Sequence, residues 1–417
     1  MLMLHSVSGG NSTDALKLVS DLFSPNNYNP VVRPVINQLE PTMVTAELTI
    51  VGFNDLDEVK QKLAVTGYLK LTWQDQLLTW SPADYGHLTH LDVPQSMIWK
   101  PDLALKNGFT KLTELGSSFV LARVENTGSV IWSPYEVFEV KCDVDIQFFP
   151  FDQQRCYLKF IAWSTSKREV FIQSRTRGLS LEVTSNAEWD IVSSRTEEVN
   201  DKLETEVWFS LLLRRKPLYT VFNIMLPVIL LSFLNLFVFV LPADCGEKMS
   251  YAVTLFLSFA VFLTIINGSL PDSSESIPTL SLFLMLQLTS GCVSIIITAF
   301  QLRINFQDEN RPVPKFLKCM VNITRFSFYK NKCFTKVKKI KPEKENEIEK
   351  DKTTPVEETQ EKEITWKDVS SAIDFIMFWV FLMFILISTI VAFRLANIGG
   401  QIEPTSSTIS NNNRNAP

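Results

Sequence analysis

Groups that usually carry enzymatic chemistry are scarce in this chain of 417 residues. It has three histidines, His5, His87 and His90, and it lacks both a nucleophile motif and a glycine-rich loop for phosphate. His87 and His90 could ligate a metal ion, but the ordinary polarity of a surface loop explains them better. The sequence therefore predicts neither an enzyme nor a protein with a metal or cofactor, and we expect no nucleic-acid partner.

A secretion signal is also missing from the start of the chain. The first ten residues, MLMLHSVSGG, have no basic start followed by an apolar core. A domain that is exported ahead of a membrane helix needs such a signal, so we interpret the chain as a processed or engineered mature form.

Four apolar runs are each long enough to cross a membrane as a helix: Leu218 to Val240, Met249 to Leu270, Leu280 to Leu302 and Ala372 to Phe393. Between Arg311 and Lys341 ten residues are Lys or Arg and none is acidic, which marks the loop after the third run as cytoplasmic. Four crossings then put both ends of the chain outside the cell. We expect an outer domain at 1–216, three membrane helices within 217–302 (218–240, 248–270 and 279–302), a cytoplasmic loop at 303–368, a fourth membrane helix at 369–395 and an outer tail at 396–417.

The second apolar run, within Glu247 to Pro271, carries hydroxyl and amide side chains that normally face protein or water in a membrane helix. At about 100° per residue, one narrow stripe of such a helix contains Glu247, Ser250, Thr254, Leu257, Val261 and Gly268. The hydroxyl groups could bond to neighbouring helices. Alternatively the stripe lines a pore, in which a ring of carboxylates concentrates cations and a girdle of Leu and Val closes the pore by dewetting.

The outer region from Val31 to about Lys216 contains short stretches that alternate between apolar and polar residues. They are TAELTIVGF, KLAVTGYLKLTW, SSFVLARVE, SVIWSPYEVFEV, RCYLKFIAW and EVWFSLLLRR. Their spacing and their β-branched and aromatic content are typical of an antiparallel, immunoglobulin-like β-sandwich. A short amphipathic helix is expected ahead of it, from Asp14 to Leu22.

The cysteines divide by compartment. Cys142 and Cys156, with thirteen residues between them, lie in the outer domain, where an oxidising environment favours a disulfide. Closing a loop of that size stabilises a domain by roughly 3 kcal/mol in the chain-entropy model. Cys319 and Cys333 repeat the spacing on the cytoplasmic side, where we expect free thiols. The sequon that starts at Asn11 is an exposed candidate for glycosylation.

The loop CDVDIQFFPFDQQRC, between Cys142 and Cys156, is the most specific string in the chain. Its apolar residues around Pro150 suggest a tip that meets the membrane or its helices, and an aromatic–proline pair favours a cis bond. The other distinctive strings are MIWKPDLAL at Met97 to Leu105, EWDIV at Glu188 to Val192, RRKPLY before the first apolar run, and LPADCGEKMS and LPDSSESIP on either side of the second.

In this order, from about residue 14 to residue 397, the strings resemble the Cys-loop receptors, the pentameric ligand-gated ion channels, and within them the nicotinic-like cation-conducting branch. The resemblance implies five subunits around one pore that is lined by the second membrane helix. It assigns Glu247 to the inner charge ring, Ser250 and Thr254 to the narrow polar part, and Leu257 and Val261 to the hydrophobic gate.

The resemblance also bears on ion selectivity. Anion-conducting relatives carry a Pro-Ala insertion, and usually an Arg, where this chain reads Cys245-Gly246-Glu247-Lys248. We therefore expect cation selectivity. Many cation-conducting members have an acidic residue at the outer mouth, where this chain has Asn267-Gly268-Ser269, so the outer focusing of cations is expected to be weaker.

In the family, agonists bind at subunit interfaces of the outer domain, in an aromatic cage that attracts a ligand ammonium. Trp163 matches the central tryptophan and Tyr68 an aromatic of the complementary face, although either could simply pack within the sandwich. Lys106 stands where nicotinic receptors have a cage tyrosine, and Arg195 to Glu206 replaces the capping loop without paired cysteines or aromatics. Acetylcholine is therefore not the expected agonist of a homopentamer.

The altered cage leaves several interpretations open. With Arg123 nearby, Lys106 could suit a carboxylate or another acidic ligand. Alternatively the site is vestigial and the chain is a partner subunit, or it responds to another stimulus. Lys106 could also be an ordinary solvated lysine.

Transmission to the gate is expected to use the contacts that the family uses. The loop residues that would meet the linker Pro271 to Pro278 are Phe149, Pro150 and Phe151. Arg214 could pair with Asp152 or with an acidic residue of the Ala46 to Asp57 region, or else serve only as an interfacial anchor.

The cytoplasmic segment divides into a basic part up to Lys341, which could touch anionic lipid headgroups, and an acidic part from Glu343 to Glu363. This composition predicts disorder for much of the segment, with a helix from Glu357 to Ser371 that continues into the fourth span.

The sequence thus predicts a plasma-membrane cation channel opened by a small extracellular ligand of unknown identity. Monovalent cations and membrane lipids are its other expected partners, and it forms a homopentamer or a heteropentamer. A non-conducting receptor or auxiliary subunit is the competing class, and the polar stripe argues against it.

Overall fold

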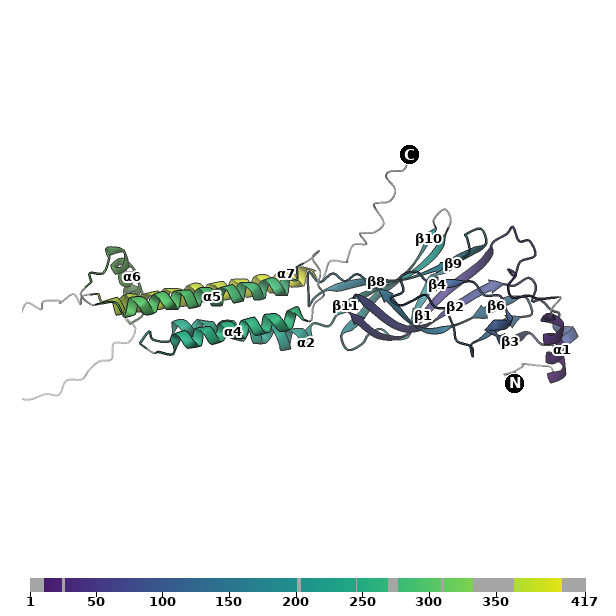
Figure 1. Cartoon of the computed structure of the whole chain (residues 1–417), viewed down its shortest axis with the longest axis horizontal. Coiled ribbons are helices and arrows are strands. Elements are labelled where there is room, and N and C mark those ends of the chain that lie inside the picture. The colour runs from purple at the N-terminus through teal and green to yellow at the C-terminus, as the bar shows by residue number, and fades with distance from the viewer. Residues whose placement is uncertain are drawn as a thin grey trace, which may run out of the picture. The chain divides into compact units, whose positions relative to one another are not determined.

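The computed structural model describes residues 11–24, 27–200, 204–244, 246–268, 277–308, 311–332 and 364–399. The chain divides into two units. The β unit contains the chain up to Tyr219, and the helical unit contains Thr220–Asn267 and Thr279–Leu395 (Figure 1).

Seven strands form the larger sheet of the β unit, in the order β3-β5-β6-β2-β1-β9, with β7 paired to the other end of β2. Their bounds are β1 Thr42–Asp57, β2 Lys62–Gln74, β3 His90–Pro94, β5 Leu121–Glu125, β6 Ser129–Trp132, β7 Tyr135–Lys141 and β9 Val170–Leu181. The described pairings are antiparallel except between β1 and β9, which run parallel. The expectation of a purely antiparallel sandwich is therefore wrong at this edge.

Four strands form the smaller sheet, in the order β10-β11-β8-β4. Their bounds are β4 Leu103–Leu105, β8 Gln153–Ala162, β10 Trp189–Asn200 and β11 Thr205–Arg215. Residues alternate between core and surface along β8, which fixes the face on which each functional side chain lies.

The core of the β unit lies between the two sheets. Phe160 of β8 and Phe209 of β11 are fully buried and their ring centroids are 5.9 Å apart, while Phe138 of the larger sheet meets Phe160 edge-on at 5.5 Å. Such edge-to-face contacts between inward-facing residues are what hold two sheets together. The predicted β-sandwich is confirmed.

Each of the six alternating stretches in the sequence contains one strand or, in the case of SVIWSPYEVFEV, two strands separated at Ser133 and Pro134. The strands that the pattern missed are β3, β4, β9 and β10. The first two have five and three residues, and the last two are mostly polar, so none of them gives a strong alternating signal.

Helix α1, Ser12–Leu22, covers one end of the sandwich with Ala15 and Leu18 buried, as the amphipathic pattern predicts. Asn11 precedes it, exposed, and its N–H donates to the Asp14 carboxylate at 3.2 Å. The candidate glycosylation site is thus accessible in the described part of the chain. Two short 3-10 turns, η1 Pro82–Tyr85 and η2 Gln95–Met97, complete the loops near this end.

Four helical stretches of the described chain, which lie mostly in the helical unit, are long and apolar enough to span a membrane: Leu218–Phe239, Lys248–Ile266, Thr279–Asn305 and Trp366–Ile398. The first is irregular and consists of α2 Leu218–Thr220, the π segment η3 Val221–Met225, α3 Leu226–Leu236 and η4 Phe237–Phe239. Pro227 lies in the first turn of α3 and has no N–H to donate, which explains why the ladder changes pitch just before it.

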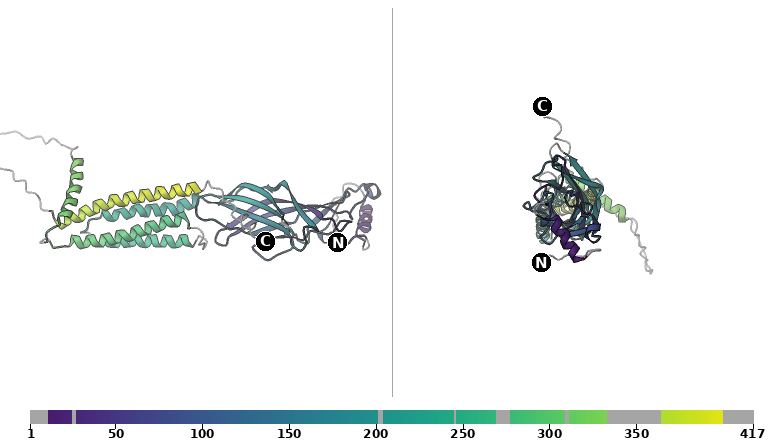
Figure 2. Two further views of the ribbon diagram at one scale, coloured as in Figure 1. Left: turned by 90° about the horizontal axis from the view of Figure 1, so that it is seen from above. Right: turned by 90° about the vertical axis from the view of Figure 1, so that its right-hand side faces the viewer.

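The other spans are the continuous helices α4 Lys248–Asn267, α5 Thr279–Asn305 and α7 Trp366–Gly399. They run side by side with α3 (Figure 2), and Phe239 and Phe381 join η4 to α7 with ring centroids 4.9 Å apart. Helix α7 begins three residues before the span expected from the sequence, because Thr365 and the Asp368 carboxylate bond across its first turn.

A further helix, α6 Lys315–Lys332, occupies most of the basic part of the cytoplasmic segment. Val321 of α6 is buried with Val369 and Ala372 of α7, so the expectation of disorder is wrong for this stretch. Cys319 is an exposed free thiol. Cys333 and the acidic part from Glu343 to Glu363 lie outside the described residues.

A buried hydrogen bond anchors the segment between α1 and β1. The Tyr28 hydroxyl donates to the Asp75 carboxylate at 2.8 Å and accepts from the Trp99 N–H at 2.9 Å. Asp75 is fully buried, and burial raises the pKa values of both its carboxyl group and the Tyr28 hydroxyl. Tyr28 therefore keeps its proton and remains a donor at neutral pH.

We expect Tyr28→Phe to destabilise the protein by about 1–3 kcal/mol, because it leaves the buried Asp75 oxygen and the Trp99 N–H without a partner. Tyr85→Phe is the matched control. It removes a hydroxyl that bonds to Asp21 at the surface, at 3.1 Å, and should change stability by less than about 0.5 kcal/mol. Thermal unfolding of the full chain in detergent measures the stability of both variants. Equal shifts in Tm would contradict a stabilising role for the buried hydrogen bond between Tyr28 and Asp75.

Candidate functional site

Trp163, the candidate cage tryptophan, is presented to solvent at the end of β8. Its side chain is 57% exposed, so it is not a packing residue of this chain's sandwich. The backbone N–H of Trp163 donates to the Asp102 carbonyl at 3.1 Å, and the Asp102 carboxylate accepts from the Ser164 N–H at 2.5 Å and the Thr165 hydroxyl at 2.7 Å. The WKPD string thus fixes the turn that displays the indole.

Lys106 is not an isolated surface lysine. Its ammonium donates to the Glu206 carboxylate and lies 3.6 Å from Glu204. The hydrogen bond to Glu206 raises the pKa of Lys106. Glu206 is buried and also accepts from the Trp208 indole N–H at 2.6 Å. An acidic ligand would have to compete with two carboxylates that Lys106 already holds.

A second cation lies beside this ion pair. The Lys159 ammonium is 4.1 Å from the centre of the Trp208 ring and 5.6 Å from that of Tyr157. The two rings meet edge-on at 5.7 Å. The outer face of the smaller sheet therefore already contains a cation–π arrangement that is occupied from within the chain.

Glu206, Trp208, Lys159 and Tyr157 were all missed from the sequence. Period-two alternation could have found three of them, because Tyr157 and Lys159 share a face of β8, and Trp208 pairs with Lys159 across the sheet. The hydrogen bond between Lys106 and Glu206 left no signal in the sequence, because it joins residues that are 100 positions apart.

Tyr68 and Arg123 lie on the other sheet. Tyr68 of β2 is partly buried between its partners Thr49 and Tyr135, and Arg123 of β5 forms two hydrogen bonds with Asp92, at 2.9 and 3.2 Å. One chain therefore does not bring Arg123 beside Lys106. The two halves of the expected cage lie on opposite outer faces of the sandwich, so one chain alone does not bring them together.

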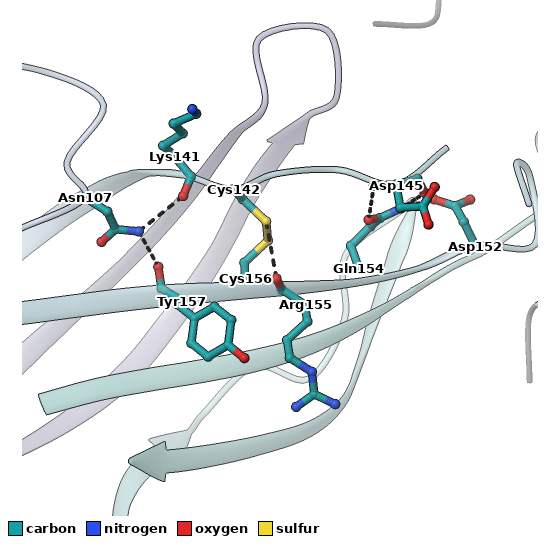
Figure 3. The surroundings of a disulfide bond; sticks show 9 residues. All are labelled: Asn107, Lys141, Cys142, Asp145, Asp152, Gln154, Arg155, Cys156 and Tyr157. Atoms are coloured by element: carbon teal, nitrogen blue, oxygen red, sulfur yellow. Dashed lines mark hydrogen bonds between the residues drawn. A yellow bond between two sulfur atoms is a disulfide. The ribbon is translucent and has the colours of Figure 1, made fainter. Parts of the chain in front are cut away.

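The predicted disulfide between Cys142 and Cys156 is present. Figure 3 shows Asn107 next to it, donating to the Lys141 and Tyr157 carbonyls at 3.2 and 2.8 Å on both sides of the bridge. These bonds fix the base of the loop that the disulfide closes.

Gln154 joins the two limbs of this loop. Its side chain accepts from the Asp145 N–H at 2.9 Å, and donates to the Asp145 carbonyl at 2.7 Å and the Asp152 carboxylate at 2.6 Å (Figure 3). The Phe149–Pro150 peptide bond is cis. Ile146 is buried in the core of the β unit, and the buried ring of Phe149 lies against Arg215, while a contact of this loop with the membrane helices stays a prediction. Pro271 lies outside the described residues.

Arg215, the last residue of β11, is the centre of a charged cluster at this loop. Its guanidinium is 8% exposed and contacts Asp152 at 2.8 Å and Glu58 at 2.6 Å. It also lies over the rings of Trp189, at 4.2 Å, and Phe149, at 4.8 Å. Burial acts to lower the pKa of Arg215, but the two carboxylates outweigh it and the pKa is raised.

The pairing expected for Arg214 therefore belongs to Arg215. Arg214 points outward, is 56% exposed and reaches only Asp190, at 3.8 Å. The alternation of β11 explains the correction. Phe209, Leu211 and Leu213 face the core, and Arg215 continues that face while Arg214 continues the other.

The predicted pore stripe is an uncovered face of α4. Glu247, Ser250, Thr254, Leu257 and Val261 are all exposed, with Leu257 and Val261 at 57% and 59%. The opposite face carries Ala252, Leu255 and Phe259, which are at most 6% exposed and pack within the helical unit. Within one chain, no other described helix covers the stripe.

Three of the Ser and Thr hydroxyl groups of α4 bond to their own helix, whereas the Tyr251 hydroxyl donates to the Leu234 carbonyl of α3 at 3.0 Å. Thr254 donates to the Ser250 carbonyl, Ser258 to the Thr254 carbonyl and Thr264 to the Ala260 carbonyl, each at 2.9 Å. These side chains therefore do not join α4 to its neighbours within the chain, which was the alternative explanation for their presence.

Comparison with known proteins agrees with this division. The family profile for the neurotransmitter-gated ion-channel ligand binding domain matches residues 15–217, and that for the neurotransmitter-gated ion-channel transmembrane region matches residues 224–331.

Among similar proteins, the neuronal acetylcholine receptor subunit beta-4 of Gallus gallus is 31% identical over 75% of this chain and 67% of its own length. The subunit alpha-3 of Homo sapiens is 32% identical, and the acetylcholine receptor subunit alpha-type acr-16 of Caenorhabditis elegans is 35% identical, each over 70% of this chain and 59% of its own length. The chain thus spans between about three fifths and two thirds of these relatives.

Arg215→Gln should destabilise the protein by about 3–5 kcal/mol, because it leaves the buried Asp152 and the partly buried Glu58 without a counter-charge. Arg214→Gln, one residue earlier, should cost less than about 1 kcal/mol, since its ion pair is exposed. Thermal unfolding in detergent and the amount of chain at the cell surface report both effects. A loss as large for Arg214→Gln would show that the cluster at Arg215 is misassigned.

Proposed function

Because this chain belongs to the neurotransmitter-gated ion channels, the Cys-loop pentameric family, we propose that it forms a cation-selective channel opened by an extracellular ligand other than acetylcholine. The family consists of ligand-gated channels and not of enzymes. Its members are multi-pass proteins of the plasma membrane with four membrane helices and an extracellular N-terminal domain, and this chain shares that organisation.

The uncovered stripe of α4 is the observation that supports conduction. A lipid-facing surface would not keep a carboxylate and two hydroxyl residues together at one end. Five copies arranged around an axis would cover the stripe, place the hydroxyl groups of Ser250 and Thr254 against the ion path, and close it at Leu257 and Val261 by dewetting. A non-conducting receptor would not require an exposed polar stripe on α4.

Cation selectivity rests on Glu247. It is exposed at the start of α4, and it is the only acidic residue of the stripe. Five carboxylates at one mouth would raise the local concentration of monovalent cations and repel anions.

The ligand is proposed to bind between two copies of the chain. Trp163 is available for contact on the smaller sheet, and Tyr68 lies on the outer face of the larger one. An amine ligand would be attracted by a carboxylate or an aromatic ring, but the Glu206 carboxylate is already paired with Lys106, and the Trp208 ring already contacts the Lys159 ammonium. These internal cations argue against acetylcholine, and the engaged Lys106 also weakens the case for a simple carboxylate.

The same ion pair supports a second candidate function. A subunit whose expected cage is occupied by its own lysine could assemble with a different subunit that supplies the agonist site. The chain would then conduct only in heteropentamers, with its own stripe contributing to the shared pore.

Gating is proposed to pass through the cluster around Arg215. The cluster joins Glu58 at the β1–β2 turn and Asp152 and Phe149 of the disulfide loop to Arg215, the last residue of β11, which lies three residues before the first membrane span. Pro150 and Phe151 belong to the same loop, so a shift of that loop would reach the chain entering the membrane.

Leu257→Ser should produce a standing current without any ligand, because a ring of hydroxyl groups wets the constriction that Leu closes. Leu263→Ser, on another side of α4, is the control and should leave the closed pore intact. In the Leu257→Ser channel the reversal potential should follow sodium and potassium, and Glu247→Gln should move it toward that of chloride. A reversal potential of the Leu257→Ser channel that follows chloride would contradict the proposed cation selectivity.

Lys106→Tyr should make the chain responsive to small amines such as acetylcholine, tetramethylammonium or choline. The substitution frees the Glu206 carboxylate and adds an aromatic ring, which contributes about 0.5–2 kcal/mol to the binding of an ammonium. Lys106→Arg keeps the internal cation and should stay unresponsive. Voltage-clamp recording of the chain expressed alone tests both, and a large acetylcholine current from the unaltered chain would refute the proposal for the ligand.

A further inference from the structure

Lys248 follows Glu247 directly at the start of α4, yet its surroundings are entirely different. Its side chain is 0% exposed, and its ammonium lies 2.6 Å from the Asp374 carboxylate of α7. Consecutive residues of a helix point about 100° apart, so Lys248 is directed into the helical unit while Glu247 remains at the surface.

The partner of Lys248 is fixed by further polar groups at this level of the helical unit. Gln301 of α5 is buried and donates to the Ser370 carbonyl at 3.1 Å, one turn of α7 before Asp374. Asn305, the last residue of α5, donates to the Asp244 carboxylate at 2.9 Å. The first bond joins α5 to α7 and the second joins α5 to the turn that precedes α4, so the elements that carry Asp374 and Lys248 are both tied to α5.

The position of the ammonium matters because two opposite charges follow one another in the sequence. If Lys248 were free, its charge would lie within a few ångströms of the Glu247 carboxylate and would cancel much of its field. A ring of five such pairs would be nearly neutral and would attract few cations. Burial against Asp374 removes the positive charge from the surface and leaves the carboxylate alone there.

We propose that Asp374, on a helix that does not carry the pore stripe, is a positioning residue for cation selectivity. It draws Lys248 into the helical unit and neutralises it, so that Glu247 dominates the potential at the inner mouth. This inference rests on the proposed cation pore, and it assigns to α7 a part in selectivity that the stripe itself does not reveal.

The test uses the Leu257→Ser channel, which opens without a ligand. Asp374→Asn in that background should lower the permeability of sodium relative to chloride by about fivefold, as expected when a positive charge is left unmasked beside each Glu247. Asp368→Asn is the matched control. It makes the same substitution six residues earlier on α7, where the carboxylate bonds to Thr365, and it should leave the reversal potential unchanged.

A merely structural role for Asp374 predicts a different pattern. Lys248→Gln combined with Asp374→Asn removes both charges, and it should restore the selectivity of the background channel if unmasked Lys248 is the cause of its loss. Reversal potentials do not depend on the amount of channel, so reduced expression cannot produce the effect. The inference is overturned if Asp374→Asn leaves the reversal potential unchanged, or if the double variant is as impaired as the single one.

Where Asp374→Asn alone does not reach the cell surface, it can be expressed together with the background chain. An epitope tag on the variant then shows that mixed channels contain it. Their reversal potential should shift toward chloride as the share of variant rises, and the absence of a shift would overturn the inference. A background channel that already prefers chloride would refute the cation pore, whereas a cation-selective background that ignores Asp374 refutes only the role of α7.

Discussion

The end of the β unit that contains the disulfide loop depends on the contacts of the Arg215 guanidinium. The guanidinium meets two carboxylates and two aromatic rings that come from three separate segments: the β1–β2 turn, the disulfide loop and the start of β10. Water is nearly excluded from it, so each partner must stay in place to offset the cost of burying the charge. Arg215 thereby fixes the disulfide loop relative to the strand that continues into the first membrane span.

Cations paired with carboxylates of the same chain recur at three candidate functional positions. Lys106 is held by Glu206 on the smaller sheet, Arg215 by Asp152 and Glu58, and Lys248 by Asp374 in the helical unit. A buried ion pair contributes little net stability compared with apolar packing, but breaking it by removing one partner is costly. The pairs therefore act chiefly by specifying geometry. At Lys106 the ion pair occupies a place where a ligand ammonium would be attracted, and at Lys248 it removes a charge from beside Glu247.

The repeating patterns of the sequence predicted the larger features well. Alternation along β1, β2, β8 and β11 and the four apolar runs led to the sandwich and the membrane spans, because burial of one face or of a whole helix leaves a periodic trace. Short or polar strands such as β4 and β9 left no such trace. Helix α6 was missed because its basic composition indicated disorder, whereas its contact with α7 through Val321 depends on chain that follows much later.

The sequence by itself determined the family, the stripe from Glu247 to Val261 and the cysteine pair, since each of these depends on residue types at fixed local spacing. Only the tertiary structure decided which charge meets which. It selected Arg215 over Arg214, separated Arg123 from Lys106, and joined Lys106 to Glu206 and Lys248 to Asp374. The physical reason is that an ion pair is chosen by distance and burial in three dimensions, and residues 100 or more positions apart carry no local pattern that announces their contact.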